Sequence, residues 1–224
     1  MHTRNLCIAA GLLTAAQTAS AFTFSKLNTD AEFSALLGSG DITELWVAQG
    51  RIGNAASNGD QEFDLGFDSG SPADQRQYAW GNNQPVSVNV SYDAGTDVLT
   101  FTAAGLSTMT LANAGAATDI YIRVRATNQR PDLSVDLSNV FIDAVAVGSI
   151  GTNNTTLDGV EYLVISGIGG NSFSLEARAT LDFNPSNPPG GSNLAFQIKG
   201  VVPTPASAAL LTLAGAATLA RRRK

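Results

Sequence analysis

A cluster of carboxylates on one short segment is the first group whose types and spacing suggest chemistry. Asp60, Glu62, Asp64 and Asp68 lie close together in the chain. Carboxylate oxygens are the ligands that Ca2+ prefers, and the ion takes roughly six to eight oxygens. Asp60, Asp64 and Asp68 are therefore candidate calcium ligands, with Ca2+ as the one cofactor considered. The loop spacing and turn glycine of an EF-hand are absent, so we favour a simpler interpretation, the exposed acidic face of a strand.

A second candidate site combines aromatic and amide side chains. Trp80 is followed closely by Asn82 and Asn83, and lectin-like jelly rolls bind sugars. An aromatic ring stacks on a sugar ring while amides hydrogen-bond its hydroxyl groups, so these three residues are candidate sugar contacts. Only 16 aromatic residues are present in the chain, and a sandwich core needs large side chains. We therefore favour a core position for Trp80, and also for Trp46.

Catalysis by paired carboxylates is the third possibility. A glycosidase needs only two acids, about 5 Å or about 6.5–9.5 Å apart. A chain with 19 acidic residues offers such pairs by chance. We therefore predict that the protein is not an enzyme, and a polysaccharide hydrolase or lyase is the third-ranked alternative.

The two ends of the chain carry targeting patterns, and the first is an export signal over residues 1–21. Arg4 precedes an apolar run, and Ala19 and Ala21 supply the small residues that signal peptidase recognises, so cleavage is expected after Ala21. The only histidine, His2, and the only cysteine, Cys7, lie inside this signal. The exported domain then lacks imidazole and thiolate, which excludes histidine-dependent hydrolases and histidine-ligated zinc sites.

Alternating strands must position the candidate residues. Strands are predicted over residues 41–50, 62–68, 85–92, 98–101, 119–127, 159–166, 172–183 and 194–200, with one or two more in 133–147. Apolar and polar residues alternate with the period of a strand most clearly over 62–68, 85–92, 119–127 and 172–183. One short helix is expected over 30–37, with Thr29 or Asp30 as its N-cap and Gly38 as its terminator. Many short strands joined by turns rich in Gly and Asn predict an all-β fold, a β-sandwich of jelly-roll type, over residues 22–200.

Charge is distributed unevenly between this domain and the ends. The region 22–200 contains all 19 acidic residues and 8 of the 13 basic residues, so its charge is near −11 against −6 for the whole chain. Such acidity disfavours binding to nucleic acid.

The third region, residues 201–224, has the pattern of a membrane sorting signal. Pro203, Thr204 and Pro205 precede an apolar run over 206–220. The chain then ends in a basic cluster that determines topology, since such clusters stay on the cytoplasmic side: Arg221, Arg222, Arg223 and Lys224. A helix over 206–220 is about 22 Å long, short of the hydrocarbon core of about 30 Å. The sequence therefore predicts a transmembrane helix that attaches the protein only transiently.

This tail resembles the PEP-CTERM sorting signal of bacteria, with Thr204 in place of its glutamate. The resemblance implies removal of the helix by an exosortase-like enzyme linked to exopolysaccharide export. The protein would then pass from a precursor tethered to the inner membrane to the cell surface or extracellular matrix.

The middle of the chain resembles a choice-of-anchor domain of the W type. The resemblance lies in the segments 77–84, 87–92, 136–143 and 173–177, and it implies a surface β-domain with no assigned activity. Together with the sorting signals it predicts an exported protein of structural or adhesive type. The alternative is a carbohydrate-binding module, with or without calcium. The expected partners are signal peptidase, an exosortase-like enzyme and exopolysaccharide, with no nucleic acid.

Overall fold

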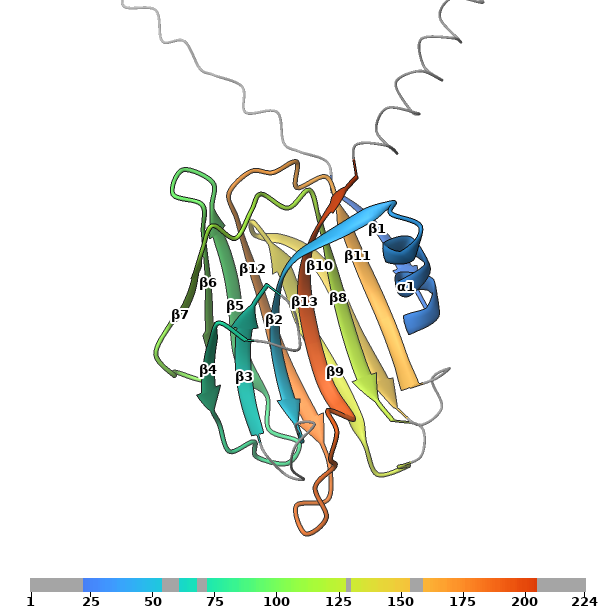
Figure 1. The fold of residues 1–224 in the computed structure, drawn as a ribbon. Coiled ribbons are helices and arrows are strands. Elements are labelled where there is room, and N and C mark those ends of the chain that lie inside the picture. Colours follow the sequence, from blue (N-terminus) through green and yellow to red (C-terminus); the bar gives the residue numbers. More distant parts are fainter. Residues whose placement is uncertain (1–21, 54–60, 68–71, 128–129, 154–158, 205–224) are drawn as a thin grey trace, which may run out of the picture.

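The computed structural model describes residues 22–53, 61–67, 72–127, 130–153 and 159–204. These residues form thirteen strands and one helix (Figure 1). All strand pairs are antiparallel, and they assemble into two sheets. The predicted all-β class is confirmed.

The first sheet, sheet A, has seven strands in the order β1-β11-β8-β13-β2-β3-β4. Its members are β1 (Thr23–Leu27), β2 (Ile42–Ile52), β3 (Gln61–Gly66), β4 (Asp74–Gln77), β8 (Asp119–Ala126), β11 (Val160–Ser166) and β13 (Leu194–Pro203).

The second sheet, sheet B, has six strands in the order β10-β9-β12-β5-β6-β7. Its members are β5 (Val86–Asp93), β6 (Val98–Ala103), β7 (Met109–Ala112), β9 (Ser134–Ile142), β10 (Val145–Asn153) and β12 (Phe173–Asp182). The predicted hairpin around the Asp93–Asp97 loop is confirmed as β5 and β6.

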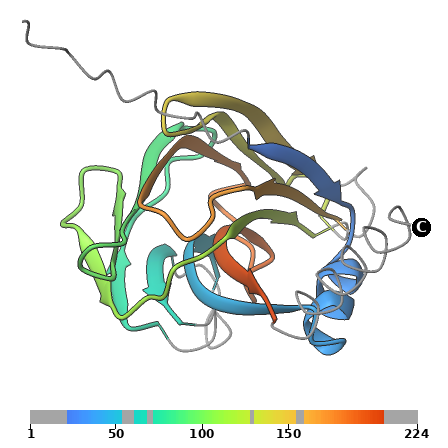
Figure 2. The ribbon, with the colours of Figure 1, turned by 90° about the horizontal axis from the view of Figure 1, so that it is seen from above.

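The two sheets lie against each other as two layers (Figure 2). Successive side chains of a strand point to opposite faces, so every second residue enters the space between the layers. The inward side chains of both sheets form one core, which includes Trp46, Phe63, Ile122 and Phe196 from sheet A and Val90, Phe101, Leu137 and Leu175 from sheet B. The outer faces of both sheets are therefore available to carry a site.

The helix α1 (Asp30–Gly38) packs on the outer face of sheet A. The ring of Phe33 lies 5.3 Å from that of Tyr121 and 5.2 Å from that of Tyr162, measured between centroids. Thr29 is confirmed as the N-cap, since its hydroxyl accepts a hydrogen bond from the Glu32 amide at 3.2 Å. Gly38 was wrong as the terminator. The helix includes it, and the chain turns at Gly40, which has a φ of 74°.

The predicted domain boundary at residue 200 falls inside β13. This strand continues through the β-branched Val201 and Val202, pairs with β2, and ends at Pro203. The backbone amide of Thr204 then donates to the Asp41 carbonyl at 3.0 Å. The sandwich therefore extends to the first two residues of the Pro-Thr-Pro motif.

The remaining terminal predictions lie outside the described residues: Ala19, Ala21, Pro205, the apolar run 206–220 and the basic cluster. Within the five described ranges, no helix is long and apolar enough to cross a membrane.

Candidate functional site

Both tryptophans lie in the core. Trp80 is only 5% exposed and Trp46 is fully buried. The Trp80 ring packs 4.9 Å from Phe63 and 5.2 Å from Tyr78, between centroids. The core interpretation of Trp80 is confirmed, and its burial leaves no ring face open for a sugar.

Asn82 and Asn83 fix the loop that follows Trp80 to the end of β12. The Asn82 side-chain oxygen accepts a hydrogen bond from the Phe183 amide at 2.8 Å. The Asn83 amide donates to the Leu181 carbonyl at 2.9 Å, and Asn83 has a left-handed φ of 55°. Both asparagines therefore hold this loop in place. The two asparagines and the buried Trp80 ring do not form a sugar-binding surface.

The acidic side chains of β3 are buried, not exposed. Glu62 has no exposed surface and Asp64 is 2% exposed, although both lie on the outer face of sheet A. Arg51, directly opposite Glu62 on β2, places one guanidinium nitrogen 2.6 Å from Glu62 and 3.0 Å from Asp64. The prediction of an exposed acidic face was wrong, because the neighbouring strand supplies a cation that makes burial of both carboxylates tolerable.

The calcium hypothesis rests on Asp64 alone among the described residues, since Asp60 and Asp68 lie outside them. One Asp64 oxygen faces Arg51 and accepts a hydrogen bond from Gln49 at 2.9 Å. A calcium ion bound there would be repelled by the guanidinium. Across the described ranges, no group of three or more Asp, Glu, His or Cys residues is placed to hold a metal ion.

Burial of Asp64 has a measurable consequence for stability. Loss of solvent raises the pKa of this carboxyl from 3.8 to about 6, with the charge of Arg51 opposing the rise and that of Glu62 adding to it. Between about pH 4 and 6 Asp64 therefore binds more protons in the folded protein than in the unfolded chain, so its contribution to stability falls as the pH rises through this window. A shift of about two pKa units corresponds to about 3 kcal/mol.

Asp64→Asn is therefore expected to remove most of the loss of stability that accompanies the rise in pH. The measurement is the free energy of unfolding in urea at pH 4.5 and at pH 7.5. Glu176→Gln, at an exposed carboxylate on β12, is the matched control and should retain the pH dependence of the parent. An equal fall in Asp64→Asn and in the parent would refute the assignment to Asp64.

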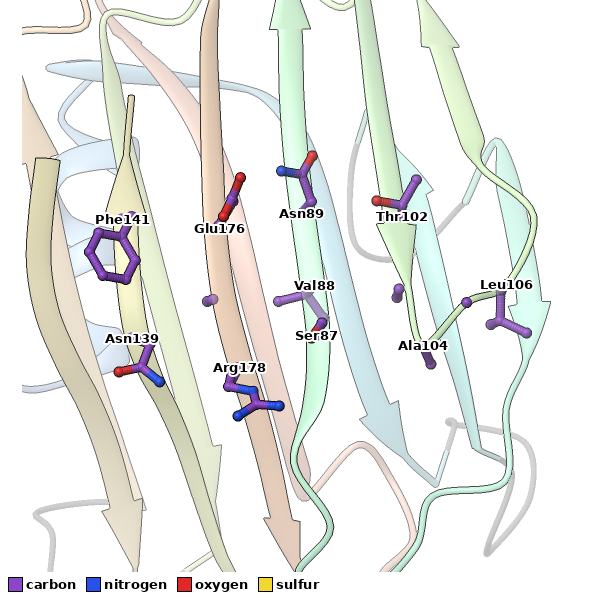
Figure 3. A pocket seen from close by; sticks show the side chains of 13 residues that line it. Ser87, Val88, Asn89, Thr102, Ala104, Leu106, Asn139, Phe141, Glu176 and Arg178 are labelled. Carbon is purple, nitrogen blue, oxygen red and sulfur yellow. The ribbon is translucent and has the colours of Figure 1, made fainter. Parts of the chain in front are cut away.

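A groove of about 620 Å3 lies on the outer face of sheet B, over β9, β12, β5 and β6 (Figure 3). Register places Phe141 opposite Glu176, Glu176 opposite Asn89, and Asn89 opposite Thr102. Neighbouring strands are about 4.8 Å apart, so this row of four side chains is about 14 Å long. We call it the groove row.

A second set of side chains lies beside the groove row. Arg178 is opposite Ser87, and Leu106 lines the far end beyond β6. Figure 3 shows Arg178 and Glu176 on the same strand and on the same side of the sheet. The groove therefore has polar side chains along its middle and apolar ones, Phe141 and Leu106, toward its ends.

Phe141 reaches the outer face because β9 contains a bulge. Leu137 and Val140 are both buried, whereas Asn139 between them is exposed and has a φ of 50°. The pairing of β9 with both neighbouring strands shifts register here. Strict alternation from Leu137 would have turned Phe141 into the core. The extra residue of the bulge shifts the alternation by one position, so Phe141 points to the outer face instead. As a result the ring is 38% exposed.

The charged side chains of the groove are not paired with each other. Glu176 and Arg178 are exposed, and neither side chain has a hydrogen bond or ion pair to another residue in the part of the chain that the structure describes. Asn89 donates one hydrogen bond to the Ser174 hydroxyl at 3.1 Å, which leaves its carbonyl oxygen for another partner. The groove therefore presents acceptors and donors whose bonding capacity is open to a ligand.

A smaller hollow of about 300 Å3 continues the groove past Phe141. It is lined by Ala144 and Ser174 together with Phe141 and Glu176, which line both hollows. Asp143 and Ala144 form the tight turn between β9 and β10, with φ values of 48° and 64°. The aromatic ring thus stands between two connected depressions.

This arrangement suits the recognition of a saccharide. An aromatic ring offers an apolar surface to the face of a sugar, while a carboxylate, a guanidinium and an amide match its hydroxyl groups. Among the described residues that line the groove, the acid is Glu176. Its carboxylate can accept hydrogen bonds from sugar hydroxyl groups.

No family model matches the chain, and no curated protein matches it either. The candidate function therefore rests on the geometry of the groove.

Sequence reasoning missed Phe141, Glu176 and Arg178 as site residues. The two charged residues alternate with core residues along the predicted strand 172–183, which already placed them on an outer face. Phe141 carried no such signal, because the bulge at Asn139 is set by backbone conformation.

Proposed function

We propose that this protein is an exported, non-catalytic surface protein that binds polysaccharide through the groove on sheet B and acts as an adhesive component of an extracellular matrix. The single observation that carries the proposal is the groove row: an exposed aromatic ring in line with a carboxylate, an amide and a hydroxyl group, across four adjacent strands.

The shape of the groove favours a polymer over a small molecule. Pockets for small ligands enclose most of the ligand surface. Here the row crosses four strands of an open sheet face (Figure 3), so an extended chain can lie across it. The excess of acidic residues disfavours nucleic acid as that chain.

The jelly-roll subtype of the sandwich is part of this proposal. β8 pairs with β13 in sheet A, while β9 pairs with β12 in sheet B. The chain passes from β8 to β9 and later from β12 to β13, so two antiparallel strands cross together from one sheet to the other. Such a wrapped pair supports a jelly roll, an architecture that lectin domains use.

The proposed route to the surface uses the two ends of the chain. Signal peptidase removes residues 1–21, the C-terminal helix holds the precursor transiently in the inner membrane, and an exosortase-like enzyme removes the tail. The end of β13 at Pro203 supports this role, because cleavage after Pro205 would leave every described strand intact. Mass spectrometry of surface-extracted protein should find a chain that begins at Phe22 and ends near Pro205. A surface fraction that retains the basic cluster would contradict the tail assignment.

Phe141→Ala is expected to weaken polysaccharide binding at least tenfold, which is about 1.4 kcal/mol. The ring supplies the apolar contact surface, and its removal leaves only solvent-exposed hydrogen bonds. Glu176→Gln should weaken binding as well, because it removes a charged acceptor. The measurement is a glycan array to find a ligand for the purified protein, followed by calorimetric titration of the variants.

The matched control is Phe24→Ala, which removes another exposed phenylalanine, on β1 of the other sheet. It should bind like the parent. Absence of any glycan ligand, or equal affinity in Phe141→Ala and Phe24→Ala, would refute binding through the groove.

A further inference from the structure

A polar pocket of about 330 Å3 lies on the opposite side of the molecule, on the outer face of sheet A. It is bounded by the start of α1 and by side chains of β2, β8, β11 and β13, the strands at the centre and right of Figure 1. The lining includes four of the protein's basic residues: Arg51, Arg123, Arg125 and Lys199.

A small residue at the centre of the pocket separates two of these arginines. Ala195 on β13 is opposite Arg125 on β8 and also opposite Arg51 on β2. Strands are about 4.8 Å apart, so the two arginine backbones are about 10 Å apart. All three side chains point to the same face, and the short methyl of Ala195 leaves room between the two guanidinium groups.

Three of the four cations already have carboxylate partners. Arg51 pairs with Glu62 and Asp64. Arg123 binds Asp30 through two nitrogens, at 2.6 and 2.5 Å. Lys199 lies 2.7 Å from Glu44. These pairs hold the walls of the pocket in place.

Arg125 is different. Within the described residues it has no carboxylate within ion-pair distance, and its hydrogen bond there goes to the neutral Asn193 side chain, at 3.1 Å. Burial lowers the pKa of Arg125 and the nearby charge of Arg123 lowers it further, while the charge of Asp30, in the same pocket, opposes both effects. An anion beside Arg125 would relieve both effects, and a guanidinium binds a carboxylate in a planar, two-point geometry.

Two further lining groups, Gln197 and Ser192, match hydroxyl groups. Gln197 uses its amide nitrogen to donate to Gln49 at 2.7 Å, which leaves its carbonyl oxygen as an acceptor. The Ser192 hydroxyl accepts from Arg51 at 3.3 Å and keeps its own proton to donate. A volume near 330 Å3 is at the lower end for ligand pockets.

We propose that this pocket binds a hydroxylated carboxylate of monosaccharide size, a sugar acid, with its carboxylate between Arg125 and Arg51 above Ala195. The proposal is independent of the groove on sheet B and does not rest on polysaccharide binding there.

Calorimetric or NMR titration of the purified protein with D-galacturonate tests this proposal. D-galactose, which has the sugar ring without the carboxylate, and acetate, which has the carboxylate without the ring, are the comparison ligands. D-galacturonate should bind, D-galactose should not, and acetate should bind more weakly. Polygalacturonate distinguishes the source of the carboxylate: binding of the polymer as well supports an acidic polysaccharide, and binding of the monomer alone supports a free sugar acid.

Arg125→Gln should weaken D-galacturonate binding at least fivefold without lowering the melting temperature, because it removes a cation that has no carboxylate partner among the described residues. Ala195→Leu, which fills the space between the arginines, should also weaken it. Arg130→Gln is the control, since Arg130 pairs with Asp132 outside the pocket.

The proposal is overturned if D-galacturonate does not bind, if acetate binds as tightly, or if Arg125→Gln binds as the parent does. Binding that is lost in Phe141→Ala but kept in Arg125→Gln would place the ligand in the groove and also overturn it.

Discussion

Arg51→Met is expected to lower the free energy of unfolding by about 3–5 kcal/mol at neutral pH. Glu62 and Asp64 are 0% and 2% exposed, and Arg51 is the cation within ion-pair distance of both. Methionine fills a similar volume but leaves two buried carboxylates without a positive charge beside them. The dominant cost is therefore the uncompensated burial of charge and not the loss of packing.

The size of this loss should depend on pH. Burial already raises the pKa of Asp64, and the charge of Arg51 opposes that rise. Without Arg51 the pKa of Asp64 in the folded state rises further above its unfolded value. Stability is then recovered as the pH falls below the folded pKa of Asp64, where this carboxyl binds a proton, and it is lost again as the pH rises. Urea unfolding at pH 7.5 and pH 5 measures the difference, which should be clearly larger at pH 7.5.

Two further variants make the result specific. Arg178→Met removes an exposed arginine that has no ion pair among the described residues, and it should change stability by no more than about 0.5 kcal/mol. Adding Glu62→Gln and Asp64→Asn to Arg51→Met removes both charges and should recover most of the loss. An Arg51→Met protein as stable as the parent at pH 7.5 would show that the carboxylates are not effectively buried.

This buried charge cluster illustrates what alternation along a strand can and cannot predict. The pattern of residues 62–68 correctly placed Phe63 and Leu65 in the core and Glu62 and Asp64 on the other face. It also placed Phe67 with Phe63 and Leu65, which was wrong, because Phe67 follows the end of β3 and is 50% exposed. It did not predict that Glu62 and Asp64 would be buried there. Alternation assigns a residue to a face, whereas burial depends on which strand lies next to it, and Arg51 comes from a different segment.

The strands that the sequence did not predict are β1, β4 and β7. Each lies at an edge of its sheet, and they are 5, 4 and 4 residues long. β4 has the sequence Asp-Gln-Arg-Gln, with no apolar residue to set a period. Edge strands pair on one side only, so the partner strand, and not the residue pattern, determines that they form.

The groove likewise combines residues that strand alternation predicts with a residue that it does not predict. Glu176 and Arg178 follow from the alternation of β12, but Phe141 depends on the bulge at Asn139. Their assembly depends further on the pairing of β9, β12 and β5, strands that are far apart in the chain. Sequence patterns thus predicted the fold class and most strands, while the candidate site arises from register.

Gly200→Ala is expected to destabilise the protein by about 3 kcal/mol or more, at the upper end of overpacking effects. Gly200 on β13 is directly opposite Trp46 on β2, and the fully buried indole lies across the glycine. An added Cβ would overlap Cε2, Cζ2 and Nε1 of that ring. The fully buried indole has little room to move, because it also stacks on Phe173, 6.1 Å away between ring centroids.

Gly38→Ala is the matched control, since an added Cβ at the end of α1 would meet nothing within 4 Å. It should leave stability unchanged or raise it by up to about 1 kcal/mol, because alanine favours the helix. Thermal and urea unfolding of both variants measures the contrast. Trp46→Phe frees the space of the second indole ring. The loss of unfolding free energy in the double variant Gly200→Ala with Trp46→Phe should therefore be smaller than the sum of the losses in the two single variants. A Gly200→Ala protein with the melting temperature of the parent would show that the indole does not occupy this position. Additive losses in the double variant would show that the two residues do not touch. The glycine in this strand is therefore required by the ring beside it, because its own φ lies outside the left-handed region.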